Sequence, residues 1–308
     1  MDFAISGVHI SPLYLAGVGF VVGILGGFFG VGGSFIAGPA LFAAGVPMNF
    51  VVGTDLAHIV GKSIVAAKKH RALGNVDFKL GLIMVVGTIA GVEAGAQIVQ
   101  HLKRLAKADV VIASGFVVVL VAMSLFIGWE SWQTLQMRRG GRAKSGGRGR
   151  AGGRKRDVSV IAFVAKAVHT FHLPPMISLP ASGIAQVSLW PILAVAVVGG
   201  LFSGFLGGGA GYIRMPALVY LLGVPTHLAV GTDLFEVVIS ASYGTLTHAL
   251  KGNVDILIAL VMHTGAAIGA QIGATLTEKF HGVVIRLAFA PLPLLGAALI
   301  IYTLLTRH

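Results

Sequence analysis

The sequence predicts an all-α polytopic membrane protein, made of two inverted repeats of about five helical segments each, with short broken Gly-rich helices at the centre. Three observations lead to this fold class. Hydrophobic residues make up 56% of the 308 residues and charged residues only 11%, whereas soluble domains carry about 25% charged residues. Several apolar stretches reach the roughly 20 residues that a helix needs to cross a bilayer. The second half also repeats the motifs of the first half in the same order.

The internal repeat begins with two Gly-rich segments at the ends of apolar stretches. GGFFGVGGSFIAGPAL starts at Gly26, and SGFLGGGAGYIRMPAL starts at Ser203. The motifs GVP, VGTDL and GNVD follow each of them at matching spacing. The repeat divides the chain into a first transmembrane repeat at residues 1–128, a basic Arg/Gly-rich loop and linker at 129–188, and a second transmembrane repeat at 189–308.

Each repeat contains five apolar segments. In the first repeat they are Leu13–Phe29, Phe35–Ala44, Val51–Ala67, Leu80–Gln100 and Val110–Ile127. In the second repeat they are Trp190–Leu206, Tyr212–Leu222, Ala229–Leu250, Ile256–Leu276 and Val283–Leu305. The second segment of each repeat is only about 10 residues long and is separated from the first by glycines. Paired, short, interrupted hydrophobic segments point to the binding site of a membrane transporter.

The distribution of basic residues predicts the orientation. Nine of the 23 Lys and Arg residues lie in the stretch Arg138–Arg156, which the positive-inside rule places in the cytoplasm. The basic loop Lys68–Lys79 falls on the same side. If the short segments return the chain, five segments invert the second half and leave the N-terminus outside. The three positive charges of His101–Lys107 on the outer side run against this assignment.

The net charge of +12 does not by itself predict nucleic-acid binding. No aromatic residues alternate with the arginines of Arg138–Arg156 to stack on bases, so no specific nucleic acid partner is expected. The bilayer is the expected partner, with anionic lipid a further candidate at this stretch. The Gly content predicts disorder there, and Asp157–Ser188 is interpreted as a small cytoplasmic linker. The sequence leaves open whether the protein is a homodimer.

The two Gly-rich segments are the first candidates for a binding site. Irregular backbone inside lipid survives only where protein or a water-filled cavity surrounds it. A half-helix that begins after such a break points free N–H groups and a positive dipole end toward the cavity. Two inverted copies therefore predict a site for an anion at mid-membrane, with candidate residues Gly30, Gly32, Gly33, Ser34, Gly207, Gly209 and Gly211. Tight helix packing is the alternative, and it is the preferred interpretation for Gly87, Gly91, Gly95 and their copies Gly265, Gly269 and Gly273.

Charged residues follow each VGTDL motif at helical spacing. Asp55, His58 and Lys62 share one helix face, and Asp233, Glu236 and Ser240 stand at the aligned positions. Polar residues inside the membrane are functional candidates by default. Lys62 is the candidate cation for the substrate, and Thr54 and Thr232 are further binding candidates. Asp55, His58, Asp233 and Glu236 are candidates for a coupling proton.

Structural alternatives exist for these charged residues. Asp55 and Asp233 follow a threonine near an expected helix start, where they would cap the helix or favour its positive end. For Lys62 the separate alternative is a structural salt bridge with Asp55 or Glu236. The chain contains no Cys and shows no His ligands at metal-like spacing. No metal, no cofactor and no enzyme activity are therefore expected.

The paired motifs, a G-x-G-G-G-x-x-x-x-P-like segment followed by GVP and VGTDL, resemble the TauE/SafE family of sulfite exporters, in the 4-toluene sulfonate uptake permease superfamily. PPMISLPASG before the second half is also similar to that family, and Ser34 departs from it, where a third glycine is frequent. The resemblance covers both halves. It implies a transporter of a small sulfur-containing anion, such as sulfite, thiosulfate or an organosulfonate. We expect a multi-pass protein of the inner membrane that works by alternating access, with export as the preferred direction and import left open, and with proton coupling as an option.

Arg214 directly follows the second Gly-rich segment, where the first half has Ala37. It is a candidate for bidentate contact with a sulfonate or sulfite, and the alternative is that it reaches to the membrane surface. The other functions left open are an anion channel, a permease for a non-sulfur organic anion, and a membrane scaffold with a basic loop. An intramembrane enzyme would need a nucleophile or metal cluster that the sequence lacks.

Overall fold

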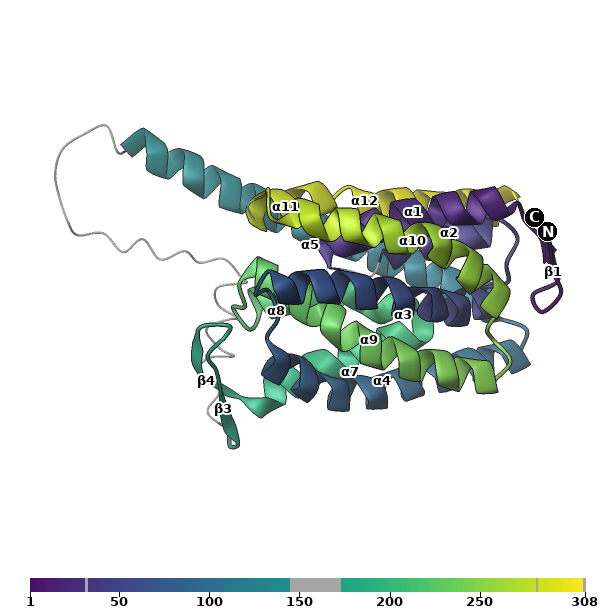
Figure 1. Cartoon of the computed structure of the whole chain (residues 1–308), viewed down its shortest axis with the longest axis horizontal. Coiled ribbons are helices and arrows are strands. Elements are labelled where there is room, and N and C mark those ends of the chain that lie inside the picture. The colour runs from purple at the N-terminus through teal and green to yellow at the C-terminus, as the bar shows by residue number, and fades with distance from the viewer. Residues whose placement is uncertain (31–32, 145–172, 281, 307–308) are drawn as a thin grey trace.

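The computed structural model describes residues 1–30, 33–144, 173–280 and 282–306 (Figure 1). Helices of the first half are α1 (Pro12–Phe29), α2 (Ser34–Ala43), α3 (Met48–Ala72), α4 (Phe78–Arg104) and α5 (Ala108–Lys144). The second half has α7 (Leu189–Leu206), the 3-10 turn η1 (Gly208–Ala210), α8 (Gly211–Tyr220), α9 (Thr226–Leu250), α10 (Ile256–Thr277), α11 (Gly282–Phe289) and α12 (Leu292–Thr306). The all-α fold class is confirmed.

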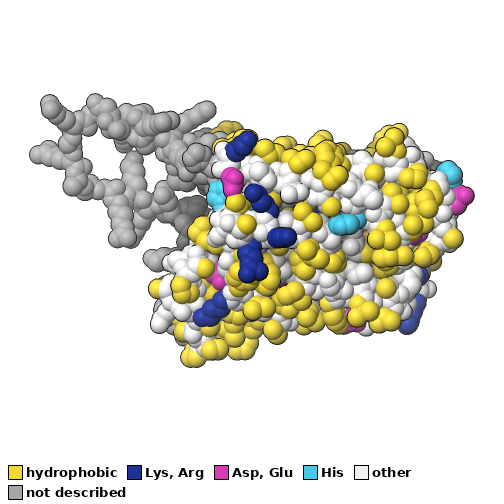
Figure 2. Space-filling model, viewed as in Figure 1, with side chains coloured by type: hydrophobic (Ala, Val, Ile, Leu, Met, Phe, Trp, Pro, Cys, Tyr) yellow, Lys and Arg dark blue, Asp and Glu magenta, His cyan; other side chains and the backbone are white. Residues whose placement is uncertain are grey.

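Seven helical stretches of the described residues are long and apolar enough to cross a membrane. They are α1, α3, α4, residues 108–129 of α5, α7, α10 and residues 287–306. Apolar side chains cover most of the visible exterior (Figure 2), and Leu13, Val86 and Leu250 are among the exposed ones. Lys and Arg gather mainly near the end that carries β3 and β4 in the same view. This distribution is that of a multi-pass membrane protein.

The ten apolar segments expected from the sequence all contain a helix, with two differences. Residues 283–305 form two helices, α11 and α12, separated at Ala290 and Pro291. Proline at this junction is expected to interrupt a helix, because it lacks the N–H group and clashes with the preceding turn. Helix α3 begins at Met48, three residues before the expected start, and α9 begins at Thr226. This earlier start affects the interpretation of the acidic residues in both helices.

The helices pack through small residues in two matching pairs. Helix α1 lies along α10, and α7 lies along α4. A methyl group on Gly91 would overlap the carbonyl oxygen of Val197, and one on Gly269 would overlap that of Phe20. Close backbone approach of this kind is typical of helix pairs in membranes. The predicted packing role of the glycines in α4 and α10 is confirmed.

Two antiparallel β-hairpins lie at opposite ends of the helical bundle (Figure 1). Strands β1 (Asp2–Phe3) and β2 (Val8–His9) form one, and β3 (Met176–Leu179) and β4 (Ile184–Ser188) form the other. The sequence did not predict either hairpin, because strands of two to five residues leave almost no periodic signal.

The central basic stretch differs in part from the expectation of disorder. Helix α5 continues to Lys144, so Arg138 and the residues up to Lys144 are helical. The chain between Trp129 and Arg139 contains no Gly or Pro and is rich in helix formers, which favours this continuation. Residues 145–156, and residues 157–172 of the expected linker, lie outside the described part of the chain.

Candidate functional site

Both Gly-rich segments break a helix, as predicted. Helix α1 ends at Phe29 and α2 begins at Ser34. The glycines that flank the break, Gly30 and Gly33, both have positive φ, +73° and +77°. Helix α7 ends at Gly207, and Gly207, Gly208 and Gly209 all have positive φ. Side chains with a Cβ rarely adopt this conformation, so glycine is needed to turn the chain here. The predicted site residue Gly32 lies outside the described residues.

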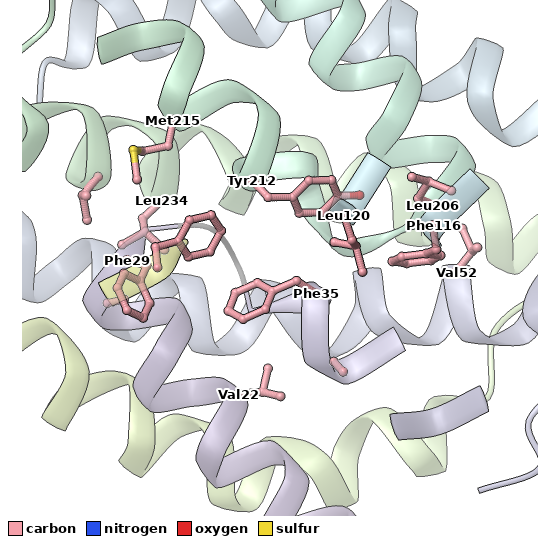
Figure 3. Packing of buried hydrophobic residues seen from close by; sticks show 14 of the residues in the cluster. Val22, Phe29, Phe35, Val52, Phe116, Leu120, Leu206, Tyr212, Met215 and Leu234 are labelled. Carbon is pink, nitrogen blue, oxygen red and sulfur yellow. The ribbon is translucent and has the colours of Figure 1, made fainter. Parts of the chain in front are cut away.

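The two breaks meet at the centre of the protein. A methyl group on Gly208 would overlap the side chain of Ser34 at the start of α2, and would lie 3.2 Å from Asp55 Oδ2 on α3. Ser34 and Asp55 are fully buried. Figure 3 shows the apolar side chains in this region, including Phe35 of α2 and Tyr212 of α8. The structure therefore brings the break of one half against the charged helix of the other.

The described glycines of the breaks are closely packed on the side where a Cβ would stand. Valine residues from neighbouring elements close over them: Val230 over Gly30, Val22 over Gly33, Val52 over Gly207 and Val237 over Gly209. The hollow expected between the breaks stays a prediction, because residues 31–32 of the first break lie outside the described residues. A glycine fits at each of these positions because the neighbouring group approaches so closely that a Cβ would collide with it. A site between the breaks requires them to move apart.

The three charged or titratable residues on one face of α3, Asp55, His58 and Lys62, are buried and differ in their partners. His58 Nδ1 lies 3.4 Å from Asp55 Oδ1. Lys62 is only 2% exposed, and its Nζ has no hydrogen-bond partner among the described residues. No described carboxylate forms an ion pair with Lys62. The alternative of a structural salt bridge for Lys62 is therefore wrong.

The capping alternative for the two aspartates is also wrong. Helix α3 has Pro47 at its N-cap, and α9 has Pro225. Asp55 and Asp233 thus lie two turns inside their helices, beyond the first turn where a side chain can cap a free N–H group. Both aspartates face the buried centre instead.

Arg214 forms a buried ion-pair cluster with the acidic residues of α9. Its Nε lies 2.8 Å from Asp233 Oδ1, and its Nη1 lies 2.8 Å from Glu236 Oε2. All three side chains are fully buried, so the alternative that Arg214 reaches to the membrane surface is wrong. Ser240, which aligns with Lys62, donates its hydroxyl to Glu236 Oε2 at 3.3 Å. Two carboxylates thus compensate the charge of one guanidinium.

Thr54 and Thr232 bind the backbone of the opposite half. Thr54 Oγ1 accepts a hydrogen bond of 2.9 Å from the N–H of Asp255, and Thr232 Oγ1 accepts one of the same length from Asp77. These aspartates end the GNVD motifs and cap α10 and α4. Ser6 of the first hairpin binds Asp255 as well. The same order of VGTDL and GNVD in the two halves thus reflects reciprocal docking.

The structure adds two polar residues that the sequence interpretation missed. The hydroxyl of Tyr212 is buried without a hydrogen-bond partner among the described residues, and Tyr212 is close enough to Asp55 and Arg214 for electrostatic interaction. A signal existed, because Tyr212 aligns with Phe35 and so adds a hydroxyl in an apolar position. His263 of α10 packs its ring against Gly61 of α3, near Lys62. The only sequence feature that could have pointed to His263 is its position inside an apolar helix.

An apolar helical bundle with two broken helices that meet on buried charges defines a multi-pass membrane transporter. The family model of the sulfite exporter TauE/SafE matches residues 15–300, and the chain belongs to this family.

Several curated relatives align with nearly the whole chain and over most of their own length. The probable membrane transporter proteins YunE and YdhB of Bacillus subtilis are each 24% identical to it. The alignments cover 88% and 92% of this chain and 90% and 97% of those proteins. The probable membrane transporter protein MJ0441 of Methanocaldococcus jannaschii is 22% identical over 88% of this chain and 87% of its own. No solved structure is significantly similar to the chain.

Proposed function

We propose that this protein exports a small sulfur-containing anion, such as sulfite, thiosulfate or an organosulfonate, across the inner membrane by alternating access. Membership in the TauE/SafE family supports the substrate class. An anion that leaves a cell with a negative interior gains about 2.3 kcal/mol per charge for each 100 mV of membrane potential. Export is therefore the direction that the potential favours.

One observation carries the proposal: the Gly-rich breaks of the two halves meet over Asp55, on the same helix face as the unpaired Lys62. Each break precedes a short helix, α2 or α8, whose first N–H groups carry partial positive charge. The substrate binds when the breaks separate and expose these N–H groups together with Ser34 and Lys62. The closed packing against valines is then the occluded state of the cycle.

The two halves are proposed to be inverted repeats. Reciprocal packing supports this, because α1 lies on α10 as α7 lies on α4, and Thr54 binds Asp255 as Thr232 binds Asp77. The hairpins that precede the two halves also lie at opposite ends of the bundle. With residues 138–156 in the cytoplasm, the first hairpin faces the outside. Rocking of one half against the other then exposes the centre to each side in turn.

Charge balance supports coupling to protons. When ionised, the central carboxylates of Asp55, Asp233 and Glu236 exceed the two cations, Lys62 and Arg214, by one charge. An anion adds a second uncompensated negative charge in a region of low dielectric, where such charges are expensive. Binding of the anion is therefore accompanied by a proton.

Flux measurements on the full-length protein in proteoliposomes test the proposal. Sulfite, thiosulfate, sulfoacetate and taurine are offered with and without a pH gradient, and with acetate as a non-sulfur anion. We expect saturable movement of at least one sulfur anion, faster when a proton gradient runs in the same direction. If only non-sulfur anions move, the substrate class is wrong. Unsaturable flux at rates far above those of transporters would instead identify an anion channel.

A further inference from the structure

We infer that Lys62 and His58 on α3 bind the anionic head group of the substrate, with a proton on His58 Nε2. Arg214, by contrast, holds helices together and is not a substrate ligand. This inference rests on the proposed function in one respect, namely that the chain binds an anion. It assigns the charge recognition to one helix of the first half.

Lys62 is a buried cation that forms no ion pair with a described carboxylate, although Asp55 on the same helix acts on it from a longer distance. Its side chain is 2% exposed, its Nζ has no hydrogen-bond partner among the described residues, and no described carboxylate pairs with it. A buried ammonium without a partner costs several kcal/mol. A protein keeps such a group where a ligand supplies the missing charge during its cycle. An anion that enters next to Lys62 provides that charge.

His58 lies one helical turn before Lys62 on the same face of α3. Its side chain is 1% exposed, its Nδ1 lies 3.4 Å from Asp55 Oδ1, and its Nε2 has no partner among the described residues. With Nδ1–H directed to Asp55, Nε2 of the neutral ring is a lone pair and cannot donate to an anion. A proton on Nε2 converts it into a charged donor. Asp55 orients the ring and stabilises this protonated form.

The charged and titratable groups around His58 agree with this role. On its own helix these are Asp55 and Lys62, and on α10 it is His263. Lys62 and a protonated His58 would be two like charges one turn apart on α3, and an anion that lies against both side chains compensates both of them. Anion and proton therefore enter together. This provides a physical mechanism for coupling within a single turn of α3.

Arg214 is bound in a different way. Asp233 and Glu236 hold two of its nitrogens at 2.8 Å, so its charge is already compensated twice. The stem of Arg214 packs so closely on α7 that a methyl group on Gly199 would overlap its Cγ. Its Nη1 lies in the ion pair with Glu236 without forming a hydrogen bond, and Nη2 has neither an ion pair nor a hydrogen-bond partner among the described residues. Because an anion at Nη2 would face two carboxylates close by, Arg214 is better suited to join α8 to α7 and α9.

The two halves thus contribute different charged residues to the recognition of the anion. The first half has Ala37 at the position of Arg214, and the second half has Ser240 at the position of Lys62. The substrate class that fits one ammonium and one imidazolium is a compact anion with a single oxyanion head group, since oxyanion oxygens accept charge-assisted hydrogen bonds from both. A sulfite, thiosulfate or sulfonate group meets this requirement.

The test measures anion binding to the purified full-length protein, as the rise in melting temperature with increasing concentrations of sulfite, thiosulfate, sulfoacetate, acetate or phosphate. We expect Lys62→Met to weaken binding of the preferred anion at least tenfold, and Lys62→Arg to retain most of it. Lys68→Met, the same change at an exposed position of α3, is the matched control and leaves binding unchanged. Without ligand, Lys62→Met raises the melting temperature, because it removes an unpaired buried charge. A merely structural lysine would lower it.

Two further variants test the other parts of the inference. Wild-type binding should tighten as the pH falls, and His58→Gln should bind weakly with no pH dependence. The triple variant Arg214→Met, Asp233→Asn, Glu236→Gln removes the whole ion-pair cluster, and with it one net negative charge, and should bind the anion at least as well as wild type or no more than about threefold more weakly. Full binding by Lys62→Met would overturn the inference, and so would loss of binding in a folded triple variant.

The outcomes also separate this inference from the proposed function. If the wild type binds only a non-sulfur anion and Lys62→Met abolishes that binding, the substrate class is wrong and the assignment to Lys62 stands. If sulfur anions bind equally to wild type and Lys62→Met, the proposed function stands and the assignment is wrong. If no anion in the series binds to the wild type, both are wrong.

Discussion

Replacing Asp255 with Ala tests the reciprocal docking of the two halves. Asp255 caps α10 by accepting hydrogen bonds from the N–H groups of Leu257 and Ile258, at 3.2 and 3.3 Å. Its second oxygen accepts bonds from the N–H and hydroxyl of Ser6, at 3.1 and 2.7 Å. Loss of an N-cap costs about 1 kcal/mol, and loss of hydrogen bonds to a charged group costs about 1.5–3 kcal/mol. The free energy of unfolding should therefore fall by about 2.5–4 kcal/mol.

The assay is reversible unfolding of the purified protein in mixed detergent micelles, followed by helical circular dichroism. Ser6→Ala removes only the hydroxyl bond and should cost about 1–2 kcal/mol. In the double variant Ser6→Ala, Asp255→Ala the two losses should not add, because Asp255→Ala already removes the partner of Ser6. The control is Asp2→Ala in the same hairpin, since Asp2 is 89% exposed in its pair with His9 and exposed pairs contribute little.

Two results would refute this reasoning. A loss below about 1 kcal/mol in Asp255→Ala would mean that neither the cap nor the bonds to Ser6 stabilise the fold to the expected degree. Fully additive losses in the double variant would mean that Ser6 and Asp255 do not act on each other. In either case the hairpin would not be a structural part of the opposite half.

Three further substitutions have distinct expected outcomes. Gly91→Ala drives a methyl group into the backbone of α7 and should cost about 1–3 kcal/mol in unfolding experiments, whereas Gly17→Ala on α1, with nothing within 4 Å, should be neutral or stabilising. Arg214→Met leaves two buried carboxylates unpaired and should cost about 3–5 kcal/mol, so an unchanged melting temperature would contradict the ion-pair cluster. Glu93→Gln weakens the 3.1 Å pair with partly exposed Lys251 and should cost about 1 kcal/mol or less; a larger loss would indicate a second buried charge site.

Much of the fold was predictable because bilayer crossing leaves a strong signal in the sequence. Length and hydropathy located the helices, and the positive-φ glycines at Gly30 and Gly207 were recognisable as breaks between apolar stretches. The motif repeat located the matching elements of the second half. These signals are local, so they need no knowledge of which helices touch.

The pairing of charges was not predictable for the opposite reason. The sequence offered Asp55 or Glu236 as partners for Lys62, but in the structure Asp55 lies next to His58, and Glu236 pairs with Arg214 of α8. Partner choice depends on how α8 and α9 are rotated toward one another, and helical spacing within α9 does not contain that information. The bonds from Thr54 and Thr232 to the GNVD loops depend in the same way on contact between the two halves.

In the proposed cycle, the contacts that the two halves share and the charges in which they differ have different roles. The two ends of the bundle are closed by the same kind of contact, a capping aspartate held by a threonine of the opposite half and a serine of a hairpin: Asp255 with Thr54 and Ser6, and Asp77 with Thr232 and Ser182. Matched contacts keep the inward- and outward-open states close in free energy, which alternating access requires because a ligand shifts an equilibrium only by its differential affinity. These matched contacts alone therefore favour neither the inward-open nor the outward-open state. The preference has to come from the ligand, the proton and the membrane potential acting on the first half, where the unpaired cation lies.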